Sequence, residues 1–144
     1  LNISLLSIDH IFYSHLHNDH ISDLAAIIWS NNYGTFRKKP LSIYGPKGFK
    51  KYFNVLLKNI LILKKPNYDL SYKVNIKELN DKSTIKLFNN EVKIKTRNVK
   101  HKGRCNGYRI EYKNKILVYT KELPNIMMIQ PKNTSAKPLS IAFL

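Results

Sequence analysis

The stretch His15-Leu16-His17-Asn18-Asp19-His20 decides how this chain is interpreted, because it places three imidazoles and a carboxylate within six residues. Zinc and other borderline metals prefer such ligands. Residues two apart in an extended backbone point the same way, so His15 and His17 can share one ion, and Asp19 and His20 then face a second. The competing interpretation is a solvated loop that is rich in histidine by chance. The order and spacing favour the metal site.

The flanking sequence places this cluster on a loop between a strand and a helix. An apolar strand is expected at residues 11–14, and an amphipathic helix at 23–30. A second strand is expected at 41–44, followed by a turn at 45–48. Apolar residues then recur at helical spacing, which predicts a second amphipathic helix over 49–60.

Beyond residue 70 the apolar residues alternate with polar ones, as half-buried antiparallel strands do. Such strands are expected around residues 72–76, 85–87, 92–96, 108–112 and 116–119. The fold class is therefore α/β, with a mostly antiparallel or mixed sheet and helices on one face. After Pro124 the periodicity is lost, and residues 125–144 predict neither a clear helix nor a clear strand.

Several further segments accompany the histidine cluster. They are Phe12-Tyr13-Ser14 before it, Ile21-Ser22-Asp23-Leu24 after it, Leu41-Ser42-Ile43-Tyr44-Gly45-Pro46-Lys47-Gly48, and Val99-Lys100-His101 followed by Gly107-Tyr108-Arg109-Ile110-Glu111. Together with the cluster they resemble the metallo-β-lactamase superfamily, in its hydrolase and ribonuclease Z branches. The resemblance extends to about Thr120. It implies a partial αββα sandwich over residues 1–123, with 124–144 as a divergent C-terminal tail.

The resemblance also implies a set of metal ligands. His15, His17 and His101 would hold a first ion, while Asp19 and His20 would bind a second, with Asp19 also acting in catalysis. Zn²⁺ is the expected metal, two ions in an intact relative, with manganese or iron as alternatives. In the family an aspartate after Ser-Gly bridges the two ions. Here the corresponding run is Tyr119-Thr120-Lys121-Glu122, so Glu122 is the candidate bridging ligand, and an exposed Lys-Glu turn is the alternative.

The chain departs from the family in its second half. Relatives supply a further histidine to the second ion, whereas this chain has none after His101, so the second site is expected to be incomplete. Truncation or a shifted reading frame would explain this difference and the divergent tail. Half of a sandwich would also expose an apolar sheet face. That exposure favours self-association, and a homodimer is one expected state.

Net charge and cysteine content limit which partners and which cellular compartment are expected. A formal net charge of +16 attracts polyanions such as RNA, although the lysines are scattered rather than gathered in one block. The single cysteine, Cys105, excludes an internal disulfide and favours a reducing cytoplasm. No apolar run reaches the ~18 residues that a membrane span needs, so no membrane association is expected.

Three functions compete at this point. The leading hypothesis is a ribonuclease Z-like phosphodiesterase that uses a metal-activated water on RNA or another phosphodiester. The long arm that transfer-RNA-processing members carry has no counterpart here, because Tyr112 passes through a short turn to Ile116. The second hypothesis is a metallo-hydrolase of an ester, thioester or lactam. The third is a truncated, non-catalytic remnant or basic binding module.

Overall fold

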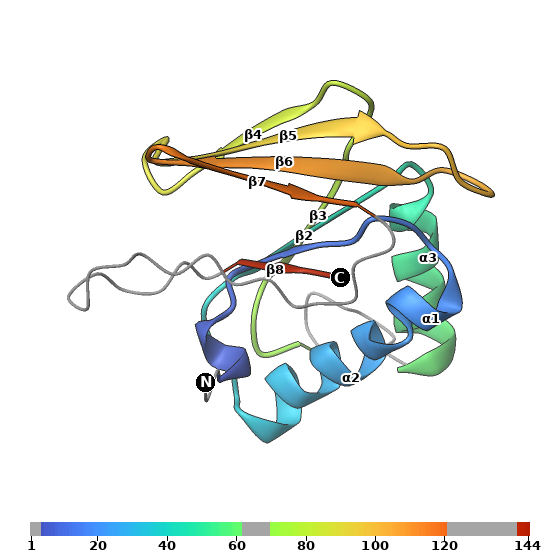
Figure 1. The fold of residues 1–144 in the computed structure, drawn as a ribbon. Coiled ribbons are helices and arrows are strands. Elements are labelled where there is room, and N and C mark those ends of the chain that lie inside the picture. Colours follow the sequence, from blue (N-terminus) through green and yellow to red (C-terminus); the bar gives the residue numbers. More distant parts are fainter. Residues whose placement is uncertain (1–3, 62–69, 121–140) are drawn as a thin grey trace.

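Two four-stranded sheets face each other in this protein, and helices cover the outer side of the first sheet (Figure 1). The computed structural model describes residues 4–61, 70–120 and 141–144. Within these residues the layers are helix, sheet and sheet, so the expected α/β class with helices on one face is confirmed.

The first sheet has the strand order β3-β2-β1-β8, and all its pairings are parallel. Its strands are β1 (His10–Phe12), β2 (Leu41–Gly45), β3 (Val74–Glu78) and β8 (Ile141–Phe143). A 3-10 turn, η1 (Leu5–Ser7), precedes β1. The helical layer comprises α1 (Asn18–Ile21), α2 (Asp23–Trp29) and α3 (Phe49–Val55), and π-helical turns continue α2 as η2 (Ser30–Gly34) and α3 as η3 (Leu56–Ile60). The helices predicted at 23–30 and 49–60 are thus present.

The second sheet is antiparallel, with the order β4-β5-β6-β7. Its strands are β4 (Thr84–Leu87), β5 (Val92–Asn98), β6 (Asn106–Tyr112) and β7 (Lys115–Tyr119). Each one lies where the alternating pattern predicts a strand. A turn at Lys113 and Asn114, with Lys113 at φ 50°, joins β6 to β7, as the short spacing from Tyr112 to Ile116 predicted.

The period-two alternation of strand residues builds two separate cores. In β1, Ile11 packs under the helices, while Phe12 points the other way, between the sheets. Phe12 stacks on Tyr44 of β2 at 4.2 Å between ring centroids and on Phe143 of β8 at 5.1 Å. The two cores fix β1 from both sides, and β1 carries the histidine cluster at its end.

Two sequence-based expectations about the strands are wrong. The strand expected near 72–76 to be antiparallel is β3, which pairs in parallel with β2. Alternation of apolar and polar residues shows that one face of a strand is solvated, but it does not show the direction of the strand. One face of β3 is solvated because β3 lies at the edge of its sheet. In addition, Ile141–Phe143 forms β8 in a region where no strand was expected, because three buried residues are too few to show a period. The domain boundary at residue 123 falls outside the described residues.

Among the residues that the structure describes, an exposed apolar sheet face is found only at one edge of the second sheet. On the outer side of the second sheet the large apolar residues are Ile116, 58% exposed, and Val118, 53% exposed, both from β7. The remaining outward positions of that sheet are mostly charged. Among the described helices, none has the length and apolar character needed to cross a membrane.

Candidate metal centre

The end of β1 is held rigidly where it enters the histidine cluster. The N–H of Tyr13 donates to the carbonyl of Tyr44 in β2 at 2.8 Å, and the N–H of Ser14 donates to the carbonyl of Leu144 beyond β8 at 3.0 Å. The carbonyl of Ser14 in turn accepts from the N–H of Asn106 in β6 at 2.8 Å. Both sheets therefore fix the backbone directly before His15.

His15 is the buried member of the cluster, at 3% exposure, and His17 is exposed. Nδ1 of His15 lies 2.8 Å from the hydroxyl oxygen of Ser14, which orients the ring. Burial, followed by the neighbouring imidazoles of His20, His101 and His17, lowers the pKa of His15 to about 4. His15 is therefore neutral near pH 7, which is the form that binds a metal.

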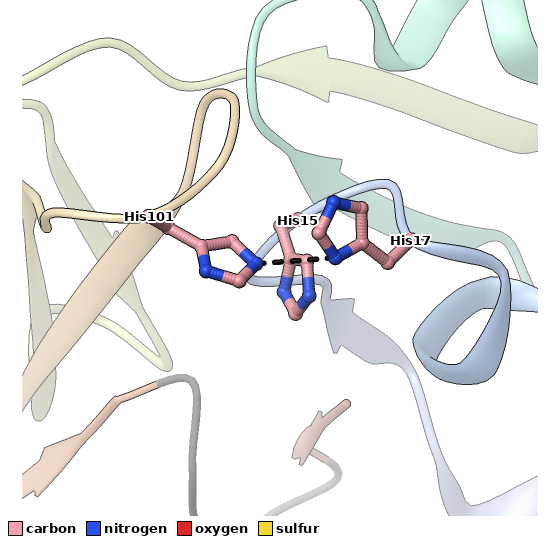
Figure 2. A group of neighbouring side chains, drawn as sticks. All are labelled: His15, His17 and His101. Carbon is pink, nitrogen blue, oxygen red and sulfur yellow. Dashed lines mark hydrogen bonds between the residues drawn. The ribbon is translucent and has the colours of Figure 1, made fainter.

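His101 reaches the same place from the loop between β5 and β6. That loop is closed by the N–H of Val99 donating to the carbonyl of Cys105 at 3.0 Å, and it reverses through Gly103 at φ 99°. Nε2 of His101 lies 3.1 Å from Nδ1 of His17 (Figure 2). Residues 84 positions apart in the sequence thus converge at one point.

The three imidazoles fit a metal ion. One nitrogen each from His15, His17 and His101 lies within 4.8 Å of the others. With Zn–N bonds near 2.0–2.1 Å, two nitrogens of a tetrahedral site are about 3.3 Å apart. The 3.1 Å between His17 and His101 is close to this value, so small ring rotations would complete a three-nitrogen site. Figure 2 shows the three rings turned toward a common point.

Asp19 and His20 lie beside this group rather than in it. They lie within α1, where Oδ2 of Asp19 is 3.3 Å from Nε2 of His20. The His20 ring is 4.3 Å from that of His15, and the Asp19 side chain is 77% exposed. Within the described residues, the three-histidine group is the only one that brings three or more such ligand atoms together. Glu122 lies outside the described residues, so its role as a ligand stays a prediction.

Two supporting residues were missed by sequence reasoning. The hydroxyl of Ser14 contacts His15, and the hydroxyl of Tyr108 donates to the carbonyl of Tyr13 at 2.6 Å across the two sheets. Both are fully buried polar groups next to the cluster. Ser14 directly precedes the first histidine and could have been suspected, whereas the position of Tyr108 depends on how the sheets stack.

Comparisons with known proteins agree on one fold and one superfamily. A family model described as "Anti-Pycsar protein Apyc1" matches residues 1–136. The ribonuclease Z of Ligilactobacillus salivarius is 37% identical over 108 residues, which cover 74% of this chain and 32% of that protein. The ribonuclease Z of Oceanobacillus iheyensis is 33% identical over 114 residues, covering 79% and 35%. This chain therefore spans about a third of the length of these relatives.

Solved structures show the same architecture. The short form of human tRNase Z superposes with a TM-score of 0.65 at 18% identity, covering 88% of this chain and 53% of that chain. The metallo-β-lactamase-fold protein YhfI from Bacillus subtilis gives a TM-score of 0.57 at 23% identity, covering 78% and 40%. At these identities the likeness establishes the fold.

Proposed function

Because the chain belongs to the Anti-Pycsar protein Apyc1 family, in the ribonuclease Z-like branch of the metallo-β-lactamase fold, we propose that it acts as a metal-dependent hydrolase of phosphodiester bonds in RNA. The observation that carries this proposal is the convergence of His15, His17 and His101. Two of these ligands come from the end of a parallel strand and the third from the opposite sheet, so the folded sandwich itself assembles the site.

In this proposal His15, His17 and His101 hold the first ion, with zinc as the default and manganese or iron as alternatives. Asp19 and His20, with Glu122, are the ligands proposed for a second ion. A bound ion would supply Lewis acidity, which lowers the pKa of a water molecule and offsets the charge that develops on the phosphate.

The residues of the chain supply orientation and proton transfer. Ser14 fixes the ring of His15 through the 2.8 Å contact, so this buried imidazole does not need to be ordered when metal arrives. The exposed carboxylate of Asp19 is open to the solvent side from which substrate approaches. There it orients the attacking water and accepts its proton as a general base. We place this activity in the reducing cytoplasm, which suits a chain whose one cysteine, Cys105, is buried.

The first test is the metal-to-protein ratio of purified chain, measured by inductively coupled plasma mass spectrometry. The proposal requires a ratio near one or two that falls to background in the double variant His15→Ala, His17→Ala. His10→Ala is the matched control, because its ring packs on Tyr44 and Phe88 away from the cluster, and it should retain metal. A ratio near zero for the unaltered chain would overturn metal binding and support the non-catalytic remnant.

Substrate class is tested separately on the metal-loaded chain. Bis-(p-nitrophenyl) phosphate and a labelled RNA would report phosphodiester hydrolysis, and p-nitrophenyl acetate would report ester hydrolysis. Turnover of the phosphodiester, lost in His101→Ala, is the expected result. Turnover of the acetate alone would replace the proposal with the carboxylic-ester alternative, the second hydrolase class that this fold supports.

A further inference from the structure

The first turn of α3 has no cap from its own residues. Gly48 stands at its N-terminal boundary and has no side chain that could accept from the backbone, and no acidic residue lies in the first turn. The first N–H groups of a helix have no partner within the helix, so they need acceptors from elsewhere. Gly48 is also at φ 104°, where a residue with a side chain would be strained. The start of α3 therefore depends on a partner outside the helix.

Glu78, at the end of β3, is that partner. Its Oε1 accepts from the N–H of Gly48 and from the N–H of Lys50, both at 2.9 Å. The strand register places Glu78 beside Gly45, and the N–H of the next residue, Leu79, donates to the carbonyl of Gly45 at 2.8 Å. A carboxylate is also favourable in charge at the start of a helix. Glu78 thus ties the turn between β2 and α3 to the end of β3.

The turn that Glu78 holds packs against residues 15–20, which we call the metal loop. A Cβ added at Gly48 would lie 3.5 Å from Cδ1 of Leu16, the residue between the first two histidines. Phe49, the next residue, stacks on the ring of Tyr13 at 5.5 Å between centroids, and both rings are fully buried. The start of α3 therefore contacts the chain both before and within the metal loop.

The metal loop has little other support at His17. Hydrogen bonds from both sheets fix the backbone as far as Ser14. Among the described residues, no backbone hydrogen bond reaches Leu16 or His17 from another strand or helix. His17 is exposed, whereas Leu16 packs on the core beneath the helices. The position of His17 thus depends on how Leu16 is packed, and Gly48 is part of that packing.

We propose that Glu78 is a positioning residue for the metal centre. Its hydrogen bonds go to the turn and not to a metal ligand, so it acts by holding Gly48 and Phe49 against the metal loop. The inference rests on the proposed function, because it assigns Glu78 a part in binding the metal that the three histidines would hold. Residues that orient ligands from outside the ligand set contribute about 10–100-fold to metal affinity. Glu78 acts through a turn, so the lower end of this range is expected.

Zinc affinity of the folded, metal-free chain is the first measurement, by competition with a chromophoric chelator. Glu78→Ala should weaken zinc binding by about tenfold. Glu78→Gln keeps a side-chain oxygen that can accept from both N–H groups, so this variant should recover most of the affinity. The visible absorption of Co²⁺ bound in place of zinc reports ligand geometry, and it should shift in Glu78→Ala but not in Glu78→Gln.

A control variant separates this role from a loss of stability alone. Val92 is fully buried at the start of β5, whereas the loop that presents His101 follows the end of that strand. Val92→Ala should therefore destabilise the core between the sheets and leave the zinc affinity of the folded protein unchanged. Equal losses of affinity in Val92→Ala and Glu78→Ala would show an effect of stability and overturn the inference.

Leu16→Ala tests the same path from the other side. It removes the contact with Gly48 and leaves the cap of α3 in place, so it serves even if Glu78→Ala does not fold. Its zinc affinity should fall by a similar factor, about tenfold. The double variant should lose no more than the weaker single variant, because both changes break one path. Full additivity, or an unaltered affinity in Leu16→Ala, would contradict the proposed route.

Hydrogen exchange in EDTA gives a readout that needs no metal. The amides of residues 15–22 should lose protection in Glu78→Ala, whereas those of β5 should keep theirs. Zinc binding by the unaltered chain, with equal affinity and equal exchange in Glu78→Ala, would overturn the positioning role alone. No zinc binding by the unaltered chain would overturn the proposed function. In that case unaltered exchange in Glu78→Ala would also overturn the role of Glu78, and lost protection of residues 15–22 would support it.

Discussion

Removing the Asp9 carboxylate should destabilise the fold at the point where the strands that build the site begin. The partner of Asp9 is Arg37, whose side chain is 1% exposed. Its NH2 group donates to Oδ1 of Asp9 at 2.6 Å and to the carbonyl of Pro40 at 3.0 Å, and its Nε donates to the carbonyl of Lys39 at 2.7 Å. Asp9 directly precedes β1 and Pro40 directly precedes β2, so this guanidinium joins the starts of two neighbouring strands.

The expected loss in the free energy of unfolding follows from the burial of the Arg37 guanidinium. Removing one partner of a buried pair costs about 3–5 kcal/mol, because the remaining charge is left uncompensated. The Asp9 side chain is 31% exposed, so water can replace part of its interaction, and the lower end of the range applies. Asp9→Ala should therefore lower the free energy of unfolding by about 3 kcal/mol. With a urea slope of about 2 kcal/mol per molar, the unfolding midpoint falls by about 1.5 M.

Urea titration followed by far-ultraviolet circular dichroism measures this change. Glu91→Ala removes the same charge from an exposed turn and should stay within about 0.5 kcal/mol of the unaltered protein. The double variant Asp9→Ala, Arg37→Met should recover part of the loss, since it leaves no unpaired buried cation. A loss below about 0.5 kcal/mol for Asp9→Ala alone would refute the reasoning, because it would mean that Arg37 keeps its hydration in the folded state.

Three further results are expected. Gly45→Ala should cost about 1–3 kcal/mol in urea titrations, because a Cβ there would overlap buried Phe49, whose own Cβ would be 2.9 Å away; an unchanged midpoint would contradict this packing. Burial lowers the pKa of His10, so the folded protein binds protons less readily than the unfolded chain, and stability should fall as pH drops through about 6.5. The variant His10→Phe should reduce that pH dependence without abolishing it, because the lowered pKa of His15 acts in the same direction. An equal slope would rule out His10 as a contributor. Glu122→Ala should reduce the metal-to-protein ratio from near two toward one, whereas an unaltered ratio would remove Glu122 from the ligand set.

The sequence predicted well those features that depend on local order. The exit from the strand at His15 and the helix at 23–30 could be predicted because ligand spacing and helical periodicity act within a few residues. The loop predicted over 15–20 is shorter than expected, because Asn18, Asp19 and His20 already lie in α1. The direction of β3 could not be predicted, because the same alternation of apolar and polar residues suits a parallel or an antiparallel strand at the edge of a sheet. The strand β8 could not be read either, because its three residues gain their stability from pairing with β1, far away in the sequence.

The same distinction explains which parts of the site were accessible. His15 and His17 are neighbours in the sequence, so their joint role follows from residue spacing alone. The place of His101 depends on the stacking of the two sheets, through contacts such as Tyr108 with Tyr13, and spacing alone could not supply it. Only the family resemblance brought His101 into the predicted ligand set before the structure was known.

The end of β7 lies close to the backbone that presents the histidine cluster. The N–H of Asn106 at the start of β6 binds the carbonyl of Ser14, and Tyr119 of β7 pairs with Tyr108, two residues along β6. The described chain therefore leaves β7 at Thr120 next to the backbone that presents His15. Glu122 is two residues beyond that point, a span of at most about 7 Å. A side chain at position 122 is therefore within reach of the backbone that presents His15, which is why Glu122 stays the candidate ligand for a second ion.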